Sequence, residues 1–208
     1  MHQIALAATS QNRHECADFI SFMKEVMSTE LCSKFEICTR SQSDSSEWHE
    51  LRYGRITASI LYETSRCKTT GSLTERILGA SQPLQTEAIK RGKMLEAEVL
   101  KVVAATKKIK INKAGLFLNP AYPIFGASPD GITDNYVIEI KCPFKEKTVE
   151  NYISVQLQML FINKKKGLFC VASPSFEQNK QVTITEVELN REELEDVMDI
   201  AAEFWKSH

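Results

Sequence analysis

Residues 136–141 read Tyr136-Val137-Ile138-Glu139-Ile140-Lys141, and this stretch decides the fold. Side chains alternate across a β-strand, so Glu139 and Lys141 share one face while Ile138 and Ile140 occupy the other. The isoleucines require burial, and the neighbouring carboxylate and ammonium are costly to desolvate unless they pair or meet a cation. Considered by itself, the stretch is also compatible with an ordinary surface strand.

The chain on either side of this strand shows helical and strand patterns in turn. Apolar residues at helical spacing predict an amphipathic helix over 13–28, and Thr86 is expected to cap a long helix ending near Thr106. Further helices are expected to begin near Thr57, near Ser72, near Thr148 and after Asn190. Strands are expected at 116–118, 124–127, 136–141, 168–172 and 181–189, the last as a half-exposed edge. This order predicts an α/β fold, a mixed central β-sheet flanked by α-helices.

Length and composition set the class of protein. With 208 residues, the chain is long enough for one α/β domain with a substantial core. The net charge of −1 does not by itself suggest a polyanion-binding protein. No apolar run reaches the roughly 20 residues of a membrane-spanning helix, and the start lacks the basic residues of a secretory signal, so we expect an intracellular protein of the nucleus or cytoplasm. The six cysteines form no CxxC pair, which argues against a zinc site.

A second acidic residue comes just before the 136–141 strand. The segment Ala127-Ser128-Pro129-Asp130-Gly131 delivers Asp130, and eight residues separate it from a Glu-x-Lys sequence. Aspartate in a Pro-Asp-Gly segment often serves the turn itself, and this alternative stays open.

A third acid lies on the long helix expected after Thr86. Glu96 comes three and four residues before Val99 and Leu100, so it shares their buried face. Acidic residues are rarely buried without a partner, so Glu96 implies a cation or a buried network, unless the helix face is misassigned. Gly92, one turn earlier, is expected to let another backbone approach closely.

Together these residues point to phosphodiester chemistry. Carboxylate oxygens are the ligands that Mg²⁺ prefers, and the ion can polarise a phosphoryl group and generate hydroxide at neutral pH. A nearby lysine can orient the attacking water and offset charge in the transition state.

The sequence resembles the PD-(D/E)xK nucleases, specifically the phage lambda exonuclease or YqaJ-like viral recombinase branch. The matching segments occur in the family's order: residues 48–59 (WHELRYGRITAS), 92–96 (GKMLE), 127–131 (ASPDG) and 139–144 (EIKCPF). The resemblance covers residues 48–208 and implies a nuclease domain there with a restriction-endonuclease-like core. Residues 1–47 are then expected to be a helical extension whose role the sequence does not assign.

The resemblance also implies roles for individual residues. Asp130 and Glu139 would ligate Mg²⁺ with the backbone carbonyl of Ile140, Glu96 would join them, and Lys141 would position the nucleophilic water. Mn²⁺ is expected to substitute. Three further residues would hold a DNA 5′-phosphate: Arg52, Ser59 and Ser128. An arginine fork and hydroxyl donors suit phosphate oxygens, whereas the alternative is helix capping by Ser59 and a surface Arg52.

One segment departs from the family pattern. The family usually carries Tyr and then a Gln-x-Gln run, with the first glutamine near the metal-bound water. Here Ser154 stands at the first glutamine position and Gln156 matches the second, so Gln156 is included in the expected catalytic set. The shorter Ser154 puts the turnover rate in doubt more than the reaction type.

These observations favour a Mg²⁺-dependent 5′→3′ exonuclease acting on linear double-stranded DNA with a 5′-phosphate, in DNA end processing or recombination. The alternatives are an endonuclease on the same scaffold and a non-catalytic DNA-end-binding recombination protein. Double-stranded DNA ends are the expected substrate. The resemblance further implies a single-strand annealing protein as a partner and a homo-oligomeric trimer ring.

Overall fold

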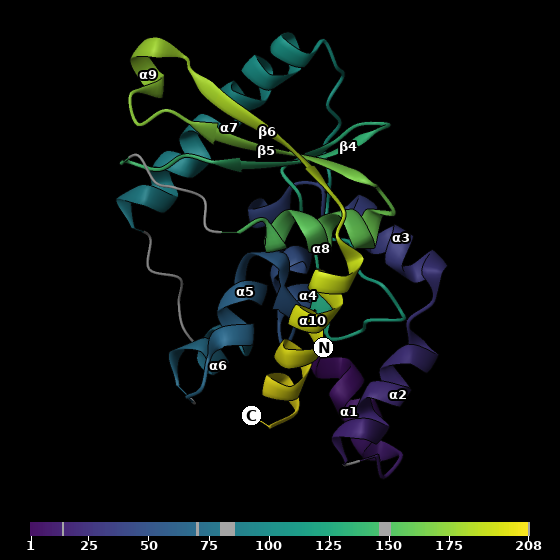
Figure 1. Ribbon diagram of the computed structural model, residues 1–208. Helices are drawn as coiled ribbons and strands as arrows, with labels where there is room; N and C mark the ends of the chain where they lie inside the picture. The colour runs from purple at the N-terminus through teal and green to yellow at the C-terminus, as the bar shows by residue number, and fades with distance from the viewer. Residues whose placement is uncertain (14, 70, 80–85, 146–150, 208) are drawn as a thin grey trace. The chain divides into compact units, whose positions relative to one another are not determined.

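A computed structural model describes residues 1–13, 15–69, 71–79, 86–145 and 151–207 (Figure 1). The chain forms two compact units, each made of separate segments of sequence. Unit 1 comprises residues 1–82, 115–128 and 191–208, and unit 2 comprises residues 83–114 and 129–190. No helix in the described ranges is long and apolar enough to span a membrane. All six cysteines are free thiols.

Unit 2 is built on a mixed sheet. Its strands are β3 (Gly131–Ile132), β4 (Tyr136–Lys141), β5 (Lys166–Ala172) and β6 (Val182–Glu188), hydrogen-bonded in that order. The β4–β5 pair is parallel, whereas β3–β4 and β5–β6 are antiparallel. A parallel pair needs a crossover connection, and α8 (Ile153–Ile162) lies on it. Figure 1 shows β5 between β4 and β6. The mixed central sheet predicted from the sequence is therefore confirmed.

Helices α7 and α8 pack against this sheet through two separate clusters of apolar residues. Helix α7 (Glu87–Lys107) begins after Thr86, whose hydroxyl oxygen accepts a hydrogen bond from the Ile89 amide at 3.3 Å, as expected of an N-cap. One cluster joins α7 to β4 and β5 and contains Leu95, Val99, Val103, Ile138, Ile140, Leu168 and Cys170. The other joins α8 to the same strands and contains Val137, Val155, Met159, Phe169 and Val187.

This packing confirms the alternation predicted for residues 136–141. Ile138 and Ile140 belong to the α7 cluster, whereas Val137 belongs to the α8 cluster. Because Glu139 and Lys141 follow Val137 at even spacing, they project from the α8 face of β4. Strand β6 lies at one edge of the sheet, and its residues range from exposed (Thr183, Glu186, Glu188) to buried (Val187), which confirms the half-exposed edge.

Unit 1 is largely helical. Its helices before residue 82 are α1 (His2–Ser10), α2 (Cys16–Val26), α3 (Thr29–Cys38), the 3-10 helix η1 (Gln42–Asp44), α4 (Ser46–Arg52), α5 (Ala58–Arg66) and α6 (Ser72–Ile77). Helix α10 (Arg191–Ser207) packs against α5. The short strands β1 (Ile56–Thr57) and β2 (Phe125–Gly126) pair in parallel, extended by a hydrogen bond of 2.9 Å from the Ile56 amide to the Ile124 carbonyl. A small α9 (Phe176–Asn179) belongs to unit 2.

The first 47 residues pack inside unit 1. The Glu36 carboxylate accepts a hydrogen bond from the Gly115 amide at 3.0 Å, and the Thr39 hydroxyl accepts one from the Leu116 amide at 2.8 Å. Glu36 and Thr39 are both buried. The boundary expected at residue 48 stays a prediction, separate from the division of the chain into two compact units.

Several expected elements differ in extent. The helix expected over 13–28 is shorter, at Cys16–Val26. Residues 116–118 form only an isolated bridge between Phe117 and Ala127, because the Leu116 amide donates to the side chain of Thr39, just after α3, instead of to a neighbouring strand. Helix α8 begins at Ile153, where the Asn151 side chain accepts the Ile153 amide; residues 148–150 of the predicted helix lie outside the described residues.

Candidate active site

Asp130 is held by the pairing of β3 with β4. Gly131 lies opposite Ile138, and the Asp130 amide donates to the Ile138 carbonyl at 3.0 Å. The Asp130 carboxylate in turn accepts the Ile140 amide at 2.6 Å. The Asp130 carboxylate thus bonds to β4 rather than to its own turn, so the alternative of local turn chemistry loses its support.

Glu139 lies at the centre of the polar contacts on β4. Its side chain is 7% exposed, and the half-exposed Lys141 donates to Oε1. The amide nitrogen of Gln158, a buried residue of α8, donates to Oε2 at 2.7 Å. Both carboxylate oxygens of Glu139 are therefore held by internal donors, one from β4 itself and one from α8.

Glu96 reaches the same region from α7. Its side chain is partly buried, and desolvation, followed by the nearby charge of Glu139, raises its pKa. Burial and the charges of Glu139 and Glu96 likewise raise the pKa of Asp130 well above its usual value, against the Ile140 amide and Lys141. Glu96, Asp130, Glu139 and Lys141 thus lie near enough for their charges to act on one another, and we call these four residues the acid cluster.

The donors of the acid cluster suit a hard divalent ion. They are carboxylate oxygens, and the charge of Glu139 raises the pKa of both Glu96 and Asp130, so a cation among them would relieve repulsion that now disfavours the charged forms. In the part of the chain that the structure describes, no three His, Cys, Asp or Glu side chains already converge as a metal-holding group. The hydrogen bonds to Ile140, Lys141 and Gln158 direct three of the carboxylate oxygens toward internal donors instead.

The two glutamines of α8 have different partners. Gln156 donates from Nε2 to the Glu188 carbonyl at 3.0 Å, and its Oε1 accepts the Asn190 amide at 2.8 Å. The structure therefore does not bring the Gln156 amide to the acid cluster, and it brings Gln158 there instead. The sequence offered one indirect signal for Gln158, which lies four residues after Ser154 and so on the same helical face.

Close to Glu96 on α7, the expectation for Gly92 is wrong. A Cβ at this position would meet no atom within 4 Å among the described residues. Among the residues that the structure describes, no backbone uses the space, so close approach does not explain this glycine. Gly131 is the position that needs a glycine, because a Cβ there would lie 2.5 Å from the Ile111 side chain.

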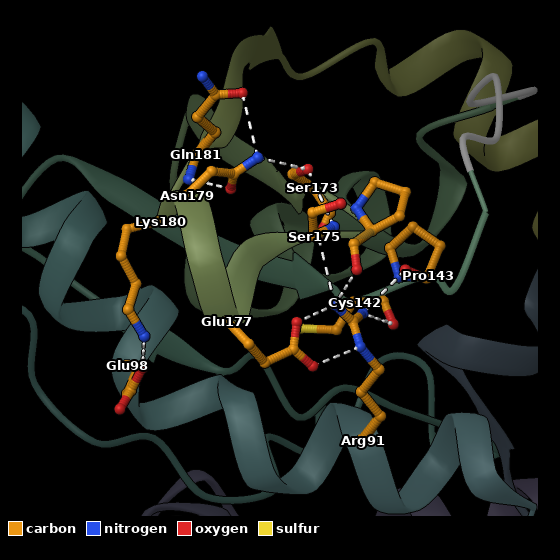
Figure 2. Close-up of polar contacts among 11 residues, drawn as sticks. Arg91, Glu98, Cys142, Pro143, Ser173, Ser175, Glu177, Asn179, Lys180 and Gln181 are labelled. Atoms are coloured by element: carbon orange, nitrogen blue, oxygen red, sulfur yellow. Dashed lines mark hydrogen bonds and ion pairs between the residues drawn. The ribbon is translucent and has the colours of Figure 1, made fainter.

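Arg91 fixes the beginning of α7 to two segments of unit 2 (Figure 2). Its guanidinium, 5% exposed, binds both oxygens of the Glu177 carboxylate at 3.0 and 2.9 Å. It also donates to four backbone carbonyls, those of Cys142, Pro143, Ser173 and Pro174. We call this set the Arg91 clamp. It ties the helix that carries Glu96 to the residues that follow Lys141.

A second group of polar side chains lies in unit 1. Pairing of β1 with β2 brings residues 52–59 beside residues 125–128, although about 70 residues separate them in sequence. The members of this group are Trp48, Arg52, Thr57, Ser59 and Ser128, which we call the Arg52 cluster. All three residues expected to hold a 5′-phosphate belong to it.

Contacts link the Arg52 cluster from end to end. The Trp48 indole donates to the Ser128 hydroxyl at 2.9 Å, and the Arg52 guanidinium lies 3.9 Å from the centre of the Trp48 ring. Arg52 also approaches the Thr57 hydroxyl at 3.5 Å, and Thr57 and Ser59 share a hydrogen bond of 3.1 Å. Sequence reasoning assigned no role to Trp48 or Thr57, although both lie in the quoted motif.

The charge of Arg52 is the main electrostatic feature of this cluster. Burial lowers the pKa of Arg52 to about 10, with no carboxylate among the causes. A desolvated guanidinium without an acidic partner favours an anion, and a planar fork suits phosphate oxygens. No side chain caps the first turn of α5, and the Ser59 hydroxyl bonds to the Thr57 hydroxyl instead.

Comparison with known proteins identifies the family. The sequence model of the viral alkaline exonuclease family matches residues 2–150, which is more than half of the chain. The match therefore includes residues 2–47, to which the motifs assigned no role. No curated protein sequence matches.

Solved structures agree on the fold. An alkaline exonuclease from Laribacter hongkongensis (LHK-Exo) aligns with a TM-score of 0.65 and 24% identity, over 78% of this chain and 92% of its own. The same values hold for that enzyme in complex with dAMP. A phage-related exonuclease from Haemophilus somnus aligns with a TM-score of 0.56 and 11% identity, over 76% of this chain and 96% of its own. At these identities the structures support the fold alone. Through the sequence match, the chain belongs to the viral alkaline exonuclease family, a group of PD-(D/E)xK DNA exonucleases that hydrolyse phosphodiester bonds.

Proposed function

We propose that this protein is a Mg²⁺-dependent 5′→3′ exonuclease that degrades one strand of linear double-stranded DNA from a 5′-phosphorylated end. The observation that carries this proposal is the Arg52 cluster, a half-buried arginine with neighbouring hydroxyl groups and no acidic partner among the described residues. A terminal phosphate carries more negative charge than an internal phosphodiester, so such a group favours a DNA end over an interior position.

Hydrolysis is assigned to the acid cluster. Asp130 and Glu139, with Glu96 and the backbone carbonyl of Ile140, would hold Mg²⁺, or Mn²⁺ in its place. When bound, the ion would polarise the phosphoryl oxygen and activate a water molecule. Lys141, whose ammonium already bonds to Glu139, would orient that water and offset the negative charge that develops on the phosphoryl oxygens.

The test is a comparison of two duplexes that differ only at one 5′ end. A linear duplex labelled at its 3′ ends is incubated with Mg²⁺, once 5′-phosphorylated and once with a 5′-hydroxyl. We expect faster release of nucleotides from the phosphorylated strand and growth of a 3′ overhang. Nicking of a covalently closed plasmid would favour the endonuclease alternative. Binding of duplex ends without cleavage would favour the non-catalytic alternative.

Variants of Arg52 and Asp130 distinguish the role of the Arg52 cluster from that of the acid cluster in this assay. Arg52→Ala should give equal rates on the phosphorylated and unphosphorylated ends, because the phosphate loses its cationic partner. Arg52→Lys keeps the charge without the fork and should retain only part of the preference. Asp130→Asn should abolish cleavage of both substrates. If Arg52→Ala kept the full preference for phosphorylated ends, the phosphate role of the Arg52 cluster would be refuted.

A further inference from the structure

Gly92 is a glycine that the described part of the fold does not require. It lies inside α7, where glycine is disfavoured relative to alanine because it loses more backbone freedom on folding. Its φ lies outside the positive range that Gly54, Gly71 and Gly79 occupy. A Cβ at position 92 would meet no atom of a described residue within 4 Å. Neither backbone conformation nor packing among these residues therefore accounts for the glycine.

The space beside Gly92 opens on the side of α7 that carries Glu96. Successive residues of an α-helix are rotated by about 100°, so Gly92 and Glu96 differ by about 40° in direction and about 6 Å along the axis. Gly92 is half-buried, as Glu96 is, whereas Met94 and Ala97 point in other directions and are exposed. The space therefore lies one turn before the residue that α7 contributes to the acid cluster.

This turn of α7 is held firmly by the residue before Gly92. Arg91 makes six hydrogen bonds in the Arg91 clamp, two to Glu177 and four to backbone carbonyls. A shift of the helix that closed the space beside Gly92 would have to break some of these bonds. The space is therefore a fixed feature of the helix surface.

The charge beside Gly92 favours an anionic occupant. Lys93 is exposed, and its charge lowers the pKa of Glu96 against the larger effects of burial and Glu139, so its ammonium lies near Glu96. A DNA strand carries a negative charge at every nucleotide, so it can meet a cation beside the acid cluster and continue along the helix.

We propose that the DNA strand cut at the acid cluster crosses α7 at Gly92, where the missing side chain lets the sugar–phosphate backbone next to the scissile bond lie against the helix. Glycine is the residue that permits so close an approach of a ligand to the main chain. Gly92 is then a specificity-determining residue that admits a polynucleotide strand. This inference rests on the proposed hydrolytic role of the acid cluster and adds a DNA contact to it.

Substitutions of increasing size at Gly92 test this contact. Alanine and leucine are better helix formers than glycine, so the Tm of Gly92→Ala and of Gly92→Leu should equal or exceed that of the parent. Duplex affinity is measured by fluorescence anisotropy on a 5′-phosphorylated duplex, with Ca²⁺ in place of Mg²⁺ to prevent cleavage. The Kd should rise from the parent to Gly92→Ala and reach about tenfold or more in Gly92→Leu, because a side chain forced into a packed contact is costly.

Ala97→Leu is the matched control on the same helix. It adds a leucine side chain at an exposed position about 140° round α7 from Gly92, so it should bind the duplex as the parent does. Unchanged duplex affinity in Gly92→Leu, or an equal loss in Ala97→Leu, would overturn the inference. A lowered Tm of Gly92→Ala would also overturn it, since the protein itself would then use the space.

A calorimetric titration with Mn²⁺ separates the DNA contact from the metal site. Gly92 supplies no ligand, so the parent and Gly92→Leu should bind Mn²⁺ with the same affinity. A loss of Mn²⁺ affinity as large as the loss of duplex affinity would overturn the inference by placing the effect at the metal site. If the parent bound the duplex but did not cleave it with Mg²⁺, the proposed function would fail, and the Kd values would still test the contact at Gly92.

Discussion

The two hydrogen-bond partners of the Glu139 carboxylate lie in different environments. One of its oxygens meets the ammonium of Lys141 and the other meets the amide of Gln158. Lys141 is about half-exposed, whereas Gln158 is buried, so the lysine is the partner that can release Glu139 and turn toward a substrate or water. Substitution of Lys141 and substitution of Gln158 should therefore have different effects on the protein.

Lys141→Ala should abolish cleavage while leaving metal affinity largely intact. The lysine is assigned to the water and to the developing charge, and such groups contribute on the order of 10² to 10⁴ in rate. Initial rates on a duplex substrate and a calorimetric titration with Mg²⁺ measure the two properties separately. A variant that bound Mg²⁺ much more weakly would contradict this assignment for Lys141.

Residue patterns predicted Glu139, Lys141, Asp130 and Glu96, but not which glutamine of α8 reaches them. Polar and apolar residues alternate along β4, and this alternation predicts which face of the strand each side chain occupies. Helix α8 is buried at nearly every position from Ile153 to Leu160, so its apolar residues give no period that could orient Gln156 relative to Gln158. Only the packed structure distinguishes the two.

At the scale of elements, α7 carries one acid of the cluster and is anchored at its first turns. The Arg91 clamp holds this end of α7 to the backbone after β4 and after β5. Thr86, the long helix and its apolar face were predictable because capping and periodicity are local signals. The clamp was not, because its partners lie 51 to 86 residues away in sequence.

Arg91→Met should destabilise unit 2 by about 3 kcal/mol or more, since it leaves buried carbonyls and Glu177 without their donor. Urea unfolding measures this change. Glu177→Gln is the matched control, expected to cost about 1 kcal/mol or less because Glu177 is 46% exposed. Equal losses in the two variants would mean that the carbonyl contacts contribute little to stability.

Substitution by alanine at two glycines should change the free energy of unfolding in opposite directions. Gly92→Ala should raise the free energy of unfolding by about 0.5 to 1 kcal/mol, because Gly92 lies inside α7 and an added methyl group meets open space. Gly131→Ala should lower it by about 1 to 3 kcal/mol, because the methyl group would overlap the Ile111 side chain. Thermal unfolding of both variants checks the signs, and a destabilised Gly92→Ala would show that the space is occupied.

On the scale of the whole molecule, the chain passes repeatedly between its two compact units. Residues 115–128 and 191–208 join residues 1–82, whereas the segments between them build the mixed sheet. Sequence motifs predicted the fold class but not this division, because the contacts of Glu36 and Thr39 with residues 115 and 116 span 79 and 77 residues. Local sequence patterns do not predict contacts between residues that lie so far apart in the sequence.

Thr39→Val tests whether the first 47 residues are part of the folded core. The substitution leaves the buried Leu116 amide unpaired and should cost about 1 to 3 kcal/mol, whereas Thr39→Ser keeps the hydroxyl and should cost less. Urea unfolding of the two variants gives the comparison. If both behaved like the parent, residues 1–47 would contribute little to the stability of unit 1.

The central claim is that the acids of the acid cluster bind one divalent ion together, and calorimetric titration with Mn²⁺ tests it most directly. The parent should show one saturable site, and Asp130→Asn and Glu139→Gln should each abolish it. Glu96→Gln should weaken it. Binding of Mn²⁺ with unchanged affinity by Asp130→Asn and Glu139→Gln would contradict the account.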